Sequence, residues 1–330
     1  MRCNAFSFQL DSIAAMGKFP RFCVNTYRWG DKFFNGYDTA YVVGTGYKFN
    51  GKIRMESWTD YYHPRFSNNT RMNMIADPTT SLGFYLNYLA VSVGYDINMG
   101  KLFGGKADGR KRWQFGFSCM LFSADLYFIR NDVGTTIRSI YVPEQPTQRV
   151  NIPFDGINTT EWGLNAYYFF NHKRYSQAAA FSFSRIQLKS QGSFFAGIAY
   201  TNQNFMFDFA KLPEEYIRDI PVTDYTLKTH NYAFQFGYGY NWVFHPKWNF
   251  GVTIAPMLGW TSGTIVEQAD RGKSFAFLLR GKLGMVWNHK QWFASSIFSF
   301  QGNLVGTKEH ALLTSYLTFE LSAGYRFNIW

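Results

Sequence analysis

Hydrophobic and polar residues alternate one by one along much of the chain, which is the pattern of β-strands whose two faces meet different surroundings. From Trp248 to Trp260, large apolar side chains and a proline hold the even positions, and mostly small or polar residues hold the odd positions. The same residues follow no helical stripe, and they include Pro256, which the interior of a helix does not tolerate. A strand therefore describes this segment better than a membrane helix.

The alternation recurs often enough to predict twelve strands. Short turns and longer connections follow one another between these strands, as in bacterial outer-membrane barrels, where the turns lie in the periplasm and the loops outside. This order closes on twelve strands and places both ends of the barrel segment on the periplasmic side. We predict the strands at residues 40–62, 80–87, 89–98, 112–120, 122–131, 159–170, 191–204, 230–243, 248–262, 273–287, 291–304 and 313–328.

The composition of the two faces identifies their surroundings. Aromatic residues make up 20% of the chain and charged residues only 17%. The apolar face is heavily aromatic, and Trp and Tyr gather at the strand ends, as a girdle at the membrane interface requires. The opposite face is rich in Gly, Ser, Asn and charges. We therefore predict an all-β protein with a single transmembrane antiparallel up-and-down β-barrel rather than a soluble β-sandwich.

Two segments depart from the alternating pattern. Residues 171–190 stand where a short turn is expected, and the stretch Ala178–Ser184 within them has the character of an extra strand. Fourteen strands are the alternative, provided that residues 132–158 hide another one. Residues 1–39 do not alternate, so we divide the chain into an N-terminal periplasmic lead or plug (1–39) and an outer-membrane barrel (40–330).

Cysteines and targeting signals add little. Cys3, Cys23 and Cys119 show no CxxC spacing, so we predict no zinc site. A Cys3–Cys23 disulfide and free thiols both stay open. The N-terminus has no sustained apolar stretch of the kind found in a signal peptide. If the protein is exported, this chain is a mature form or is truncated at its start.

Three stretches resemble known outer-membrane proteins. The aromatic C-terminus, Tyr325–Trp330, resembles the assembly signal of this broad class. Asp38–Asn50 and Lys189–Gly197 resemble two parts of an uncharacterised outer-membrane β-barrel family of Bacteroidota, a domain of unknown function. The resemblance covers about residue 36 to the end. It implies a porin-like barrel in the outer membrane of a Gram-negative bacterium, and it implies no activity.

No catalytic or cofactor motif stands out. The six histidines lie in turns or at strand ends, and no HExxH motif or activated serine is present. The nearest surface constellation is Glu309–His310 with Ser315, for which an exposed loop is the simpler interpretation. The glycine-rich stretch Gly104–Lys111 lacks the Lys-Ser/Thr pair of a phosphate loop. We therefore predict no enzyme, no metal site and no cofactor.

Charged residues on the polar face are the most informative group. Strand parity places six cations and five carboxylates toward the barrel interior. Closure of the barrel brings the first and last strands together, so the charges of the first strand are expected to face Glu320 and Arg326 across the seam. Two interpretations follow: a salt-bridge lattice that fills a narrow lumen, or a charged constriction that selects solutes. The lumen of twelve strands is narrower than that of the ~16–18-stranded porins. These residues are Lys48, Lys52, Arg54, Glu56, Asp96, Asp125, Glu161, Arg280, Lys282, Glu320 and Arg326.

The net charge of +11 at first suggests nucleic acid, but its distribution does not. Much of the excess falls on the turn side as a basic rim. By the electrostatics that draw basic segments to anionic membranes, we predict that this rim meets outer-membrane lipid headgroups or an acidic periplasmic or envelope protein. We expect no nucleic-acid partner. The rim consists of Lys173, Arg174, Arg185, Lys189, Lys247 and Lys290.

The function that these features favour is a narrow channel or small-solute transport protein in the outer membrane. The alternative is a structural or assembly component that binds an envelope partner through its loops or its basic rim. A barrel lipid hydrolase ranks third, because no catalytic set is visible. The sequence names neither the solute nor the partner, nor the oligomeric state.

Overall fold

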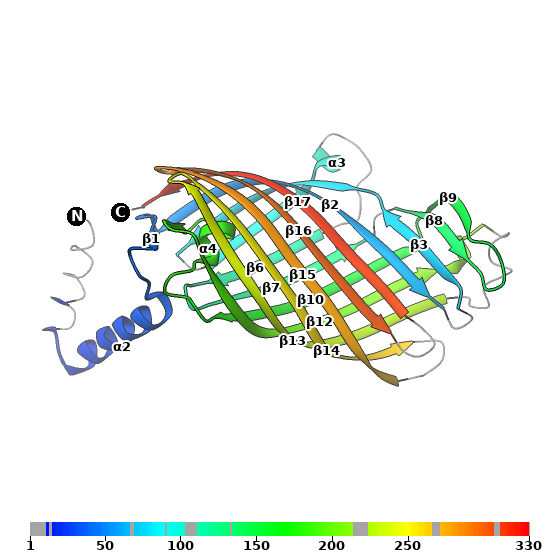
Figure 1. The fold of residues 1–330 in the computed structure, drawn as a ribbon, viewed down its shortest axis with the longest axis horizontal. Helices are drawn as coiled ribbons and strands as arrows, with labels where there is room; N and C mark the ends of the chain where they lie inside the picture. Colours follow the sequence, from blue (N-terminus) through cyan, green and yellow to red (C-terminus); the bar gives the residue numbers. More distant parts are fainter. Residues whose placement is uncertain are drawn as a thin grey trace.

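The computed structural model describes residues 11–12, 15–66, 69–89, 91–102, 111–132, 134–213, 224–265, 271–306 and 311–329. Within them, fifteen strands form one antiparallel sheet, and twelve of these strands close into a barrel (Figure 1). The closure is the pairing of the last strand, β17 (Ala311–Phe327), with β2 (Phe49–Arg65) over the full length of both. Among the described residues, each of the twelve barrel strands pairs with a neighbouring strand on both sides.

The twelve-strand prediction is confirmed, and the fourteen-strand alternative is wrong. Short turns join the strands at one end of the barrel, here called the turn end, and longer connections join them at the other, the loop end. The remaining barrel strands are β4 (Thr79–Tyr88), β5 (Val91–Asn98), β6 (Lys111–Ser118), β7 (Phe122–Asn131), β10 (Ile157–Phe169), β12 (Gln191–Asp208), β13 (Asp224–His245), β14 (Trp248–Ile265), β15 (Arg271–His289) and β16 (Trp292–Gly306).

Three further strands prolong the wall beyond the barrel at the loop end. They are β3 (Arg71–Ala76), β8 (Thr135–Tyr141) and β9 (Gln148–Phe154), and they lie in segments that the sequence pattern assigns to loops. β4 pairs with the part of β2 from Phe49 to Trp58, whereas β3 pairs with β2 only near Tyr61, Tyr62 and Arg65. The hidden strands in 132–158 therefore extend the sheet outward and do not enlarge the barrel.

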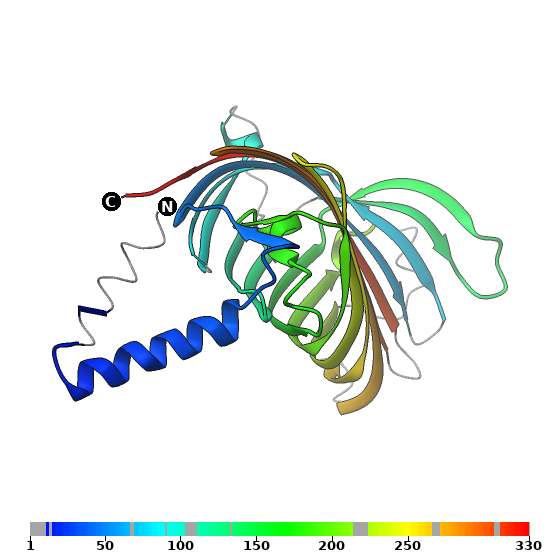
Figure 2. The same ribbon diagram turned by 60° about the vertical axis from the view of Figure 1, so that its left-hand side comes forward.

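Residues 171–190 fold back into the turn end of the barrel, and we call them the inner plug. They form the short helix α4 (Gln177–Phe181) and the strand β11 (Arg185–Gln187), with α4 inside the ring of strands (Figure 2). A barrel-spanning strand at Ala178–Ser184 is therefore ruled out. The physical reason is that the apolar residues of this stretch, Ala178–Ala180 and Phe183, are buried within the lumen instead of facing lipid.

The first predicted strand begins nine residues later than expected, at Phe49, because the residues before it pair with the inner plug. β1 (Val42–Gly44) and β11 form a separate two-stranded sheet. A close approach on the barrel wall makes room for α4: a Cβ added to Gly251 would lie 2.4 Å from the Cβ of Ala180. Small residues on both the barrel wall and the plug therefore allow the two to pack closely.

Helix α2 (Lys18–Asn35) is an element that the strand pattern did not predict. It lies outside the ring of strands, at the end that also holds α4 (Figures 1 and 2). Phe19, Phe22 and Trp29 follow a helical spacing and are 76%, 66% and 66% exposed. No described helix is long and apolar enough to cross a membrane. The division at residue 39 stays a prediction, but residues 171–190 are the described segment that occupies part of the lumen at this end.

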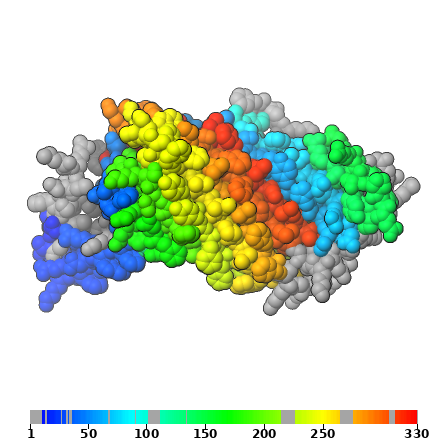
Figure 3. Space-filling view, viewed as in Figure 1, coloured from blue at the N-terminus to red at the C-terminus, as the bar shows by residue number. Residues whose placement is uncertain are grey.

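The outer surface of the barrel carries the large apolar side chains. Phe234, Phe236, Ile254 and Leu258 are all exposed on the outward face of β13 and β14, whereas their inward neighbours are buried. The side chains of adjoining strands make a continuous wall in the space-filling view (Figure 3). An apolar exterior around hydrogen-bonded, edgeless strands is the solution for a sheet in lipid, so the predicted outer-membrane barrel fold is confirmed.

We predict that Ile254→Arg destabilises the barrel by about 2–4 kcal/mol, because it places a charge within the lipid-facing band. Phe244→Arg, close to the turn end, should cost only about 0–1 kcal/mol, since a charge there reaches the interface. Urea titration in lipid vesicles, followed by tryptophan fluorescence, measures both values. Equal losses for the two variants would contradict this placement of the membrane.

Candidate functional site

The described residues enclose a cavity of about 260 Å³ inside the barrel. Its wall consists of inward-facing strand residues together with Gln177, Phe181, Ser182 and Ser184 of the inner plug. Toward the loop end the lining reaches Asp60, and toward the turn end it reaches Leu89, in the turn between β4 and β5. At the turn end, the cavity therefore passes beside the plug along β4 to β7.

Arg54 is the centre of an ion-pair network on the wall of this cavity. Its Nη2 lies 2.6 Å from Asp96 Oδ2 and 3.0 Å from Glu56 Oε2, and its Nη1 lies 3.4 Å from Glu320 Oε2. The register of the closing strands places Glu320 directly opposite Glu56. Two like charges in such a cross-strand pair repel each other, so the guanidinium between them is what makes this register acceptable.

Two further cations complete the network. Lys52 Nζ lies 3.0 Å from Glu320 Oε1, and Arg112 Nη1 lies 2.9 Å from Glu56 Oε1. Three positive and three negative side chains therefore neutralise one another, as buried charges must. We call this group the seam network: Lys52, Arg54, Glu56, Asp96, Arg112 and Glu320.

Two other carboxylates of the cavity are held by tyrosines. The hydroxyls of Tyr127 and Tyr316 donate to Glu161 over 2.8 and 2.9 Å, and the hydroxyl of Tyr167 donates to Asp125 over 3.3 Å. No Lys or Arg of the described chain forms an ion pair with Glu161 or Asp125 within 4.0 Å. These carboxylates are thus oriented by neutral donors.

Arg280 and Lys282 stand on the inward face of β15, almost across the lumen from β7. In the order of strands around the barrel, β10, β12, β13 and β14 separate β7 from β15 on one side, and six strands separate them on the other. Arg280 donates to the amide oxygen of Gln301 through Nε (3.0 Å) and Nη2 (2.8 Å). Lys282 Nζ lies 5.9 Å from the ring centre of Phe181.

The eleven charged residues predicted to face the lumen divide into two groups. Three of them do not line the cavity: Asp96, Lys48 and Arg326. Asp96 forms an ion pair with Arg54 outside the lining, and Lys48 is exposed near the turn end. The other eight line the cavity: Lys52, Arg54, Glu56, Asp125, Glu161, Arg280, Lys282 and Glu320.

Arg326 contacts other residues than the sequence predicts. We expected it to face the charges of the first strand, but the register pairs it with Asn50, and its guanidinium points to the plug. Its Nε donates to the carbonyl of Phe183 over 3.0 Å, and its Nη2 donates to Asn288 Oδ1 over 2.5 Å. That expectation is wrong: the buried guanidinium binds a backbone oxygen of the inner plug and an amide oxygen of β15.

Sequence reasoning left Asp60 and Arg112 out of the lumen group, although both line the cavity. It assigned them to the strand tops beside the outer loops. Both residues occupy the inward-facing alternate positions of their strands, so alternation could have identified them. Asp60 is on the same face of its strand as Arg54 and Glu56, and Arg112 is on the same face as Gln114. Strand ends are poorly defined by alternation, because the apolar coat ends before the strand does.

The basic rim is partly engaged with the segment that precedes the barrel. The guanidinium of Arg174 lies 4.9 Å from the Tyr41 ring and 3.6 Å from Asp38 Oδ2. The guanidinium of Arg185 is half-buried, 4.9 Å from the Tyr37 ring. Lys173, Lys247 and Lys290 are exposed at the turn end, as is Lys189. A role of this rim toward lipid or an envelope partner stays a prediction.

The candidates for catalysis and metal binding find no support among the described residues. Ser315 lies on the lipid-facing parity of β17, and Glu309–His310 falls outside the residues that the structure describes. The described chain brings no three metal-ligating side chains together. Cys23 and Cys119 are free thiols, and burial raises the pKa of Cys119. Cys3 lies outside the described residues.

The model of a family described as a domain of unknown function, DUF4421, matches residues 36–327. The chain belongs to this family. Helix α2 precedes the matched region, which begins just before β1 and includes the whole barrel and the inner plug. The resemblance noted in the sequence is thereby confirmed at the level of an outer-membrane-type barrel of unknown function, and the Bacteroidota origin stays a prediction. No curated protein matches the chain.

Solved structures with similar folds are distant. The outer-membrane protease OmpT of Escherichia coli is 8% identical, with a TM-score of 0.42 over 84% of this chain and 96% of its own. The translocator domain of the autotransporter NalP of Neisseria meningitidis is 12% identical, with a TM-score of 0.36 over 83% and 88%. OprG of Pseudomonas aeruginosa is 10% identical, with a TM-score of 0.30 over 87% and 100%. Such values carry no information about activity.

We predict that Arg54→Met lowers the free energy of unfolding by about 3–5 kcal/mol, because it leaves three buried carboxylates without their shared cation. Adding Glu320→Gln to this variant should restore part of the loss. Arg130→Met, which breaks an exposed pair with Asp132, should cost less than about 1 kcal/mol. Urea titration of the folded barrel compares the three, and equal losses for Arg54→Met and Arg130→Met would contradict the seam network.

Proposed function

We propose that this family member is an outer-membrane barrel that acts as a narrow, gated channel for small polar solutes. The observation that carries the proposal is the charged cavity inside the closed barrel, which reaches the turn end beside the inner plug. A cavity of about 260 Å³ with charged walls suits small polar solutes and excludes large ones. Location in a Gram-negative outer membrane is part of this proposal, supported by the apolar coat and the barrel fold.

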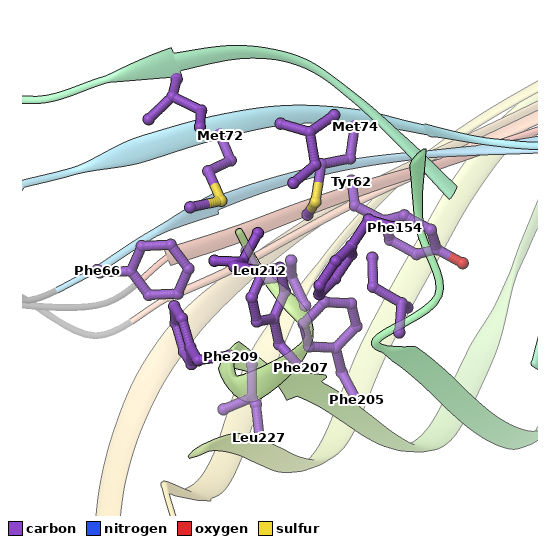
Figure 4. Packing of buried hydrophobic residues seen from close by; sticks show 14 of the residues in the cluster. Tyr62, Phe66, Met72, Met74, Phe154, Phe205, Phe207, Phe209, Leu212 and Leu227 are labelled. Carbon is purple, nitrogen blue, oxygen red and sulfur yellow. The ribbon is translucent and has the colours of Figure 1, made fainter. Parts of the chain in front are cut away.

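An apolar cluster closes the lumen at the loop end. Tyr62 and Phe66 of the β2 end, with Phe205 and Phe207 of β12, point inward and pack under the methionines of β3 (Figure 4). The Phe207 ring centre lies 4.7 Å from that of Phe154 and 4.5 Å from that of Phe209. A dry apolar constriction blocks ions and polar solutes by excluding water. We call this group the loop-end cluster.

The loop-end cluster has the construction of a gate. Part of it belongs to the barrel wall, and part belongs to β3, β8 and β9, which extend the sheet outside the closed ring. An extension held to the barrel mainly through the end of β2 is freer to move than the ring itself. Displacement of this extension separates the two halves of the cluster and opens the lumen.

The inner plug, in contrast, is fixed to the wall by polar bonds as well as packing. Asn241 Nδ2 donates to the carbonyl of Ser176 over 2.7 Å, and Arg326 donates to that of Phe183. The Phe183 ring stacks on Phe293 with ring centres 4.8 Å apart. Since the cavity passes beside this fixed plug, the plug narrows the route and the loop-end cluster interrupts it.

We predict that the wild-type protein conducts little in a planar bilayer, and that the double variant Phe207→Ala, Phe209→Ala conducts several-fold more. Removing two rings from the loop-end cluster admits water to the constriction. Phe194→Ala, an exposed position on the lipid-facing side of β12, should conduct as the wild type does. The gel mobility of unheated samples verifies that each variant is a folded barrel. A folded double variant that conducts no more than the wild type would contradict the gated channel.

A second candidate function is attachment to an envelope protein at the turn end. Helix α2 exposes Phe19, Phe22 and Trp29 there, and exposed aromatic groups of this kind mark interaction surfaces. Exposed Arg21 on the helix and the lysines of the basic rim favour an acidic partner. Helix α2 precedes the region matched by the family model, whereas the lysines of the basic rim lie inside it.

We predict that a partner co-purifies with the wild-type chain from mild detergent and is lost when Phe19, Phe22 and Trp29 are changed to Ser. Phe244→Ser, which removes an exposed aromatic residue from the barrel wall, should retain the partner. Affinity purification with mass spectrometry provides the readout. A wild-type barrel that always purifies alone would count against the attachment function.

A further inference from the structure

We infer that the cavity binds a small zwitterionic solute, with the carboxylate of the solute toward Arg280 and Lys282 and its ammonium group toward Asp125 and Glu161. This inference deepens the proposed channel function and rests on it, because it names the class of solute. Its basis is the set of partners that each charged residue of the cavity has, and the side of the barrel on which that residue lies.

The seam network contributes little to solute binding. Its three cations and three carboxylates are paired with one another at distances between 2.6 and 3.4 Å. A solute that entered this network would have to break an ion pair for each contact that it made. The charges that remain for a solute are those elsewhere in the cavity.

Arg280 and Lys282 are two such charges. Arg280 touches the neutral amide of Gln301, and Lys282 approaches the ring of Phe181. Among the described residues, no carboxylate lies within 4.0 Å of either cation. Both line the cavity, two residues apart on one face of β15. Ammonium and guanidinium groups in this position favour an anionic group as partner.

Asp125 and Glu161 are their counterparts of opposite sign. Their oxygens accept hydrogen bonds from tyrosine hydroxyls, which hold the carboxylates in place. They stand on the neighbouring strands β7 and β10, where Asp125 is opposite Asn165 and Glu161 is opposite Ile129. A carboxylate oriented in this way favours a cationic group.

The two pairs occupy walls that face each other. β15 is separated from β10 by three strands and from β7 by four, within a ring of twelve, so the cations and the carboxylates lie on different sides of the lumen. A solute with both charges is attracted at both ends. A solute with a single charge is attracted by one wall and repelled by the other, which makes charge distribution the basis of selection.

The size of the cavity agrees with this class of solute. Its volume of about 260 Å³ is far above the ~10–15 Å³ that one water needs. It is slightly below the ~300–1,000 Å³ of pockets for drug-sized ligands. A solute of amino-acid size fills such a space and spans part of the distance between the two walls.

The test uses three probes of four carbons each on the full chain in detergent: 4-aminobutanoate, butanoate and butylamine. Isothermal titration calorimetry should show that 4-aminobutanoate binds at least about tenfold more tightly than either singly charged probe, a difference of about 1.4 kcal/mol. Butanoate binding as tightly as 4-aminobutanoate would overturn the inference in favour of an anion site. Absence of binding by all three probes would also overturn it.

Two variants test the assignment of each wall. Lys282→Met should weaken 4-aminobutanoate about tenfold and leave butylamine unweakened, whereas Asp125→Asn should weaken 4-aminobutanoate equally and leave butanoate unweakened. Lys290→Met and Asp155→Asn change exposed residues outside the cavity and serve as matched controls. If both lumen variants affect all probes alike, the separation of charges is not what selects the solute.

The channel proposal and the solute-site proposal can be contradicted separately. If the opened loop-end variant stays silent while 4-aminobutanoate binds selectively, the channel is wrong and the site is right. If that variant conducts but shows no preference for 4-aminobutanoate, the site is wrong and the channel stands.

Discussion

The structure depends on one constraint: a strand that faces lipid has no water for its backbone, so each edge must be hydrogen-bonded to another strand. The pairing of β17 with β2 along their full length meets this requirement. Closure also gives every barrel strand an inside and an outside, and it determines which side chains share the lumen. The apolar coat, the charged interior and the cavity all follow from that single seam.

Closure then creates an electrostatic problem that the same strands solve. Glu56 and Glu320 meet directly across the seam, where repulsion opposes the pairing that the barrel needs. Arg54 lies one inward position from Glu56 and contacts both carboxylates, and Lys52 and Arg112 balance the rest. The seam network is therefore chiefly structural. Charges on the other strands, which the seam does not need, are the ones that remain for a solute.

The two ends of the lumen are built differently, and this asymmetry carries the functional proposal. At the turn end, residues 171–190 are bonded to the wall through Asn241 and Arg326, and space remains beside them. At the loop end, aromatic residues pack against strands that lie outside the closed ring. A rigid restriction and a movable apolar barrier, with a charged chamber between them, are the parts of a gated passage.

The sequence by itself favoured twelve strands over fourteen, and it determined the faces that they present and the order of turns and loops. Lipid outside and polar groups inside impose an alternation of apolar and polar residues along each strand. This alternation involves only neighbouring residues of the chain, so it is visible in the sequence alone. Only the tertiary structure decided where Ala178–Ser184 lies, because an apolar segment is equally satisfied by lipid or by a filled lumen. It also decided that Arg326 holds the plug and that Arg54 joins three carboxylates, since such contacts depend on register and on strands distant in the chain. Helix α2 was missed because strand alternation does not detect a stripe with helical spacing.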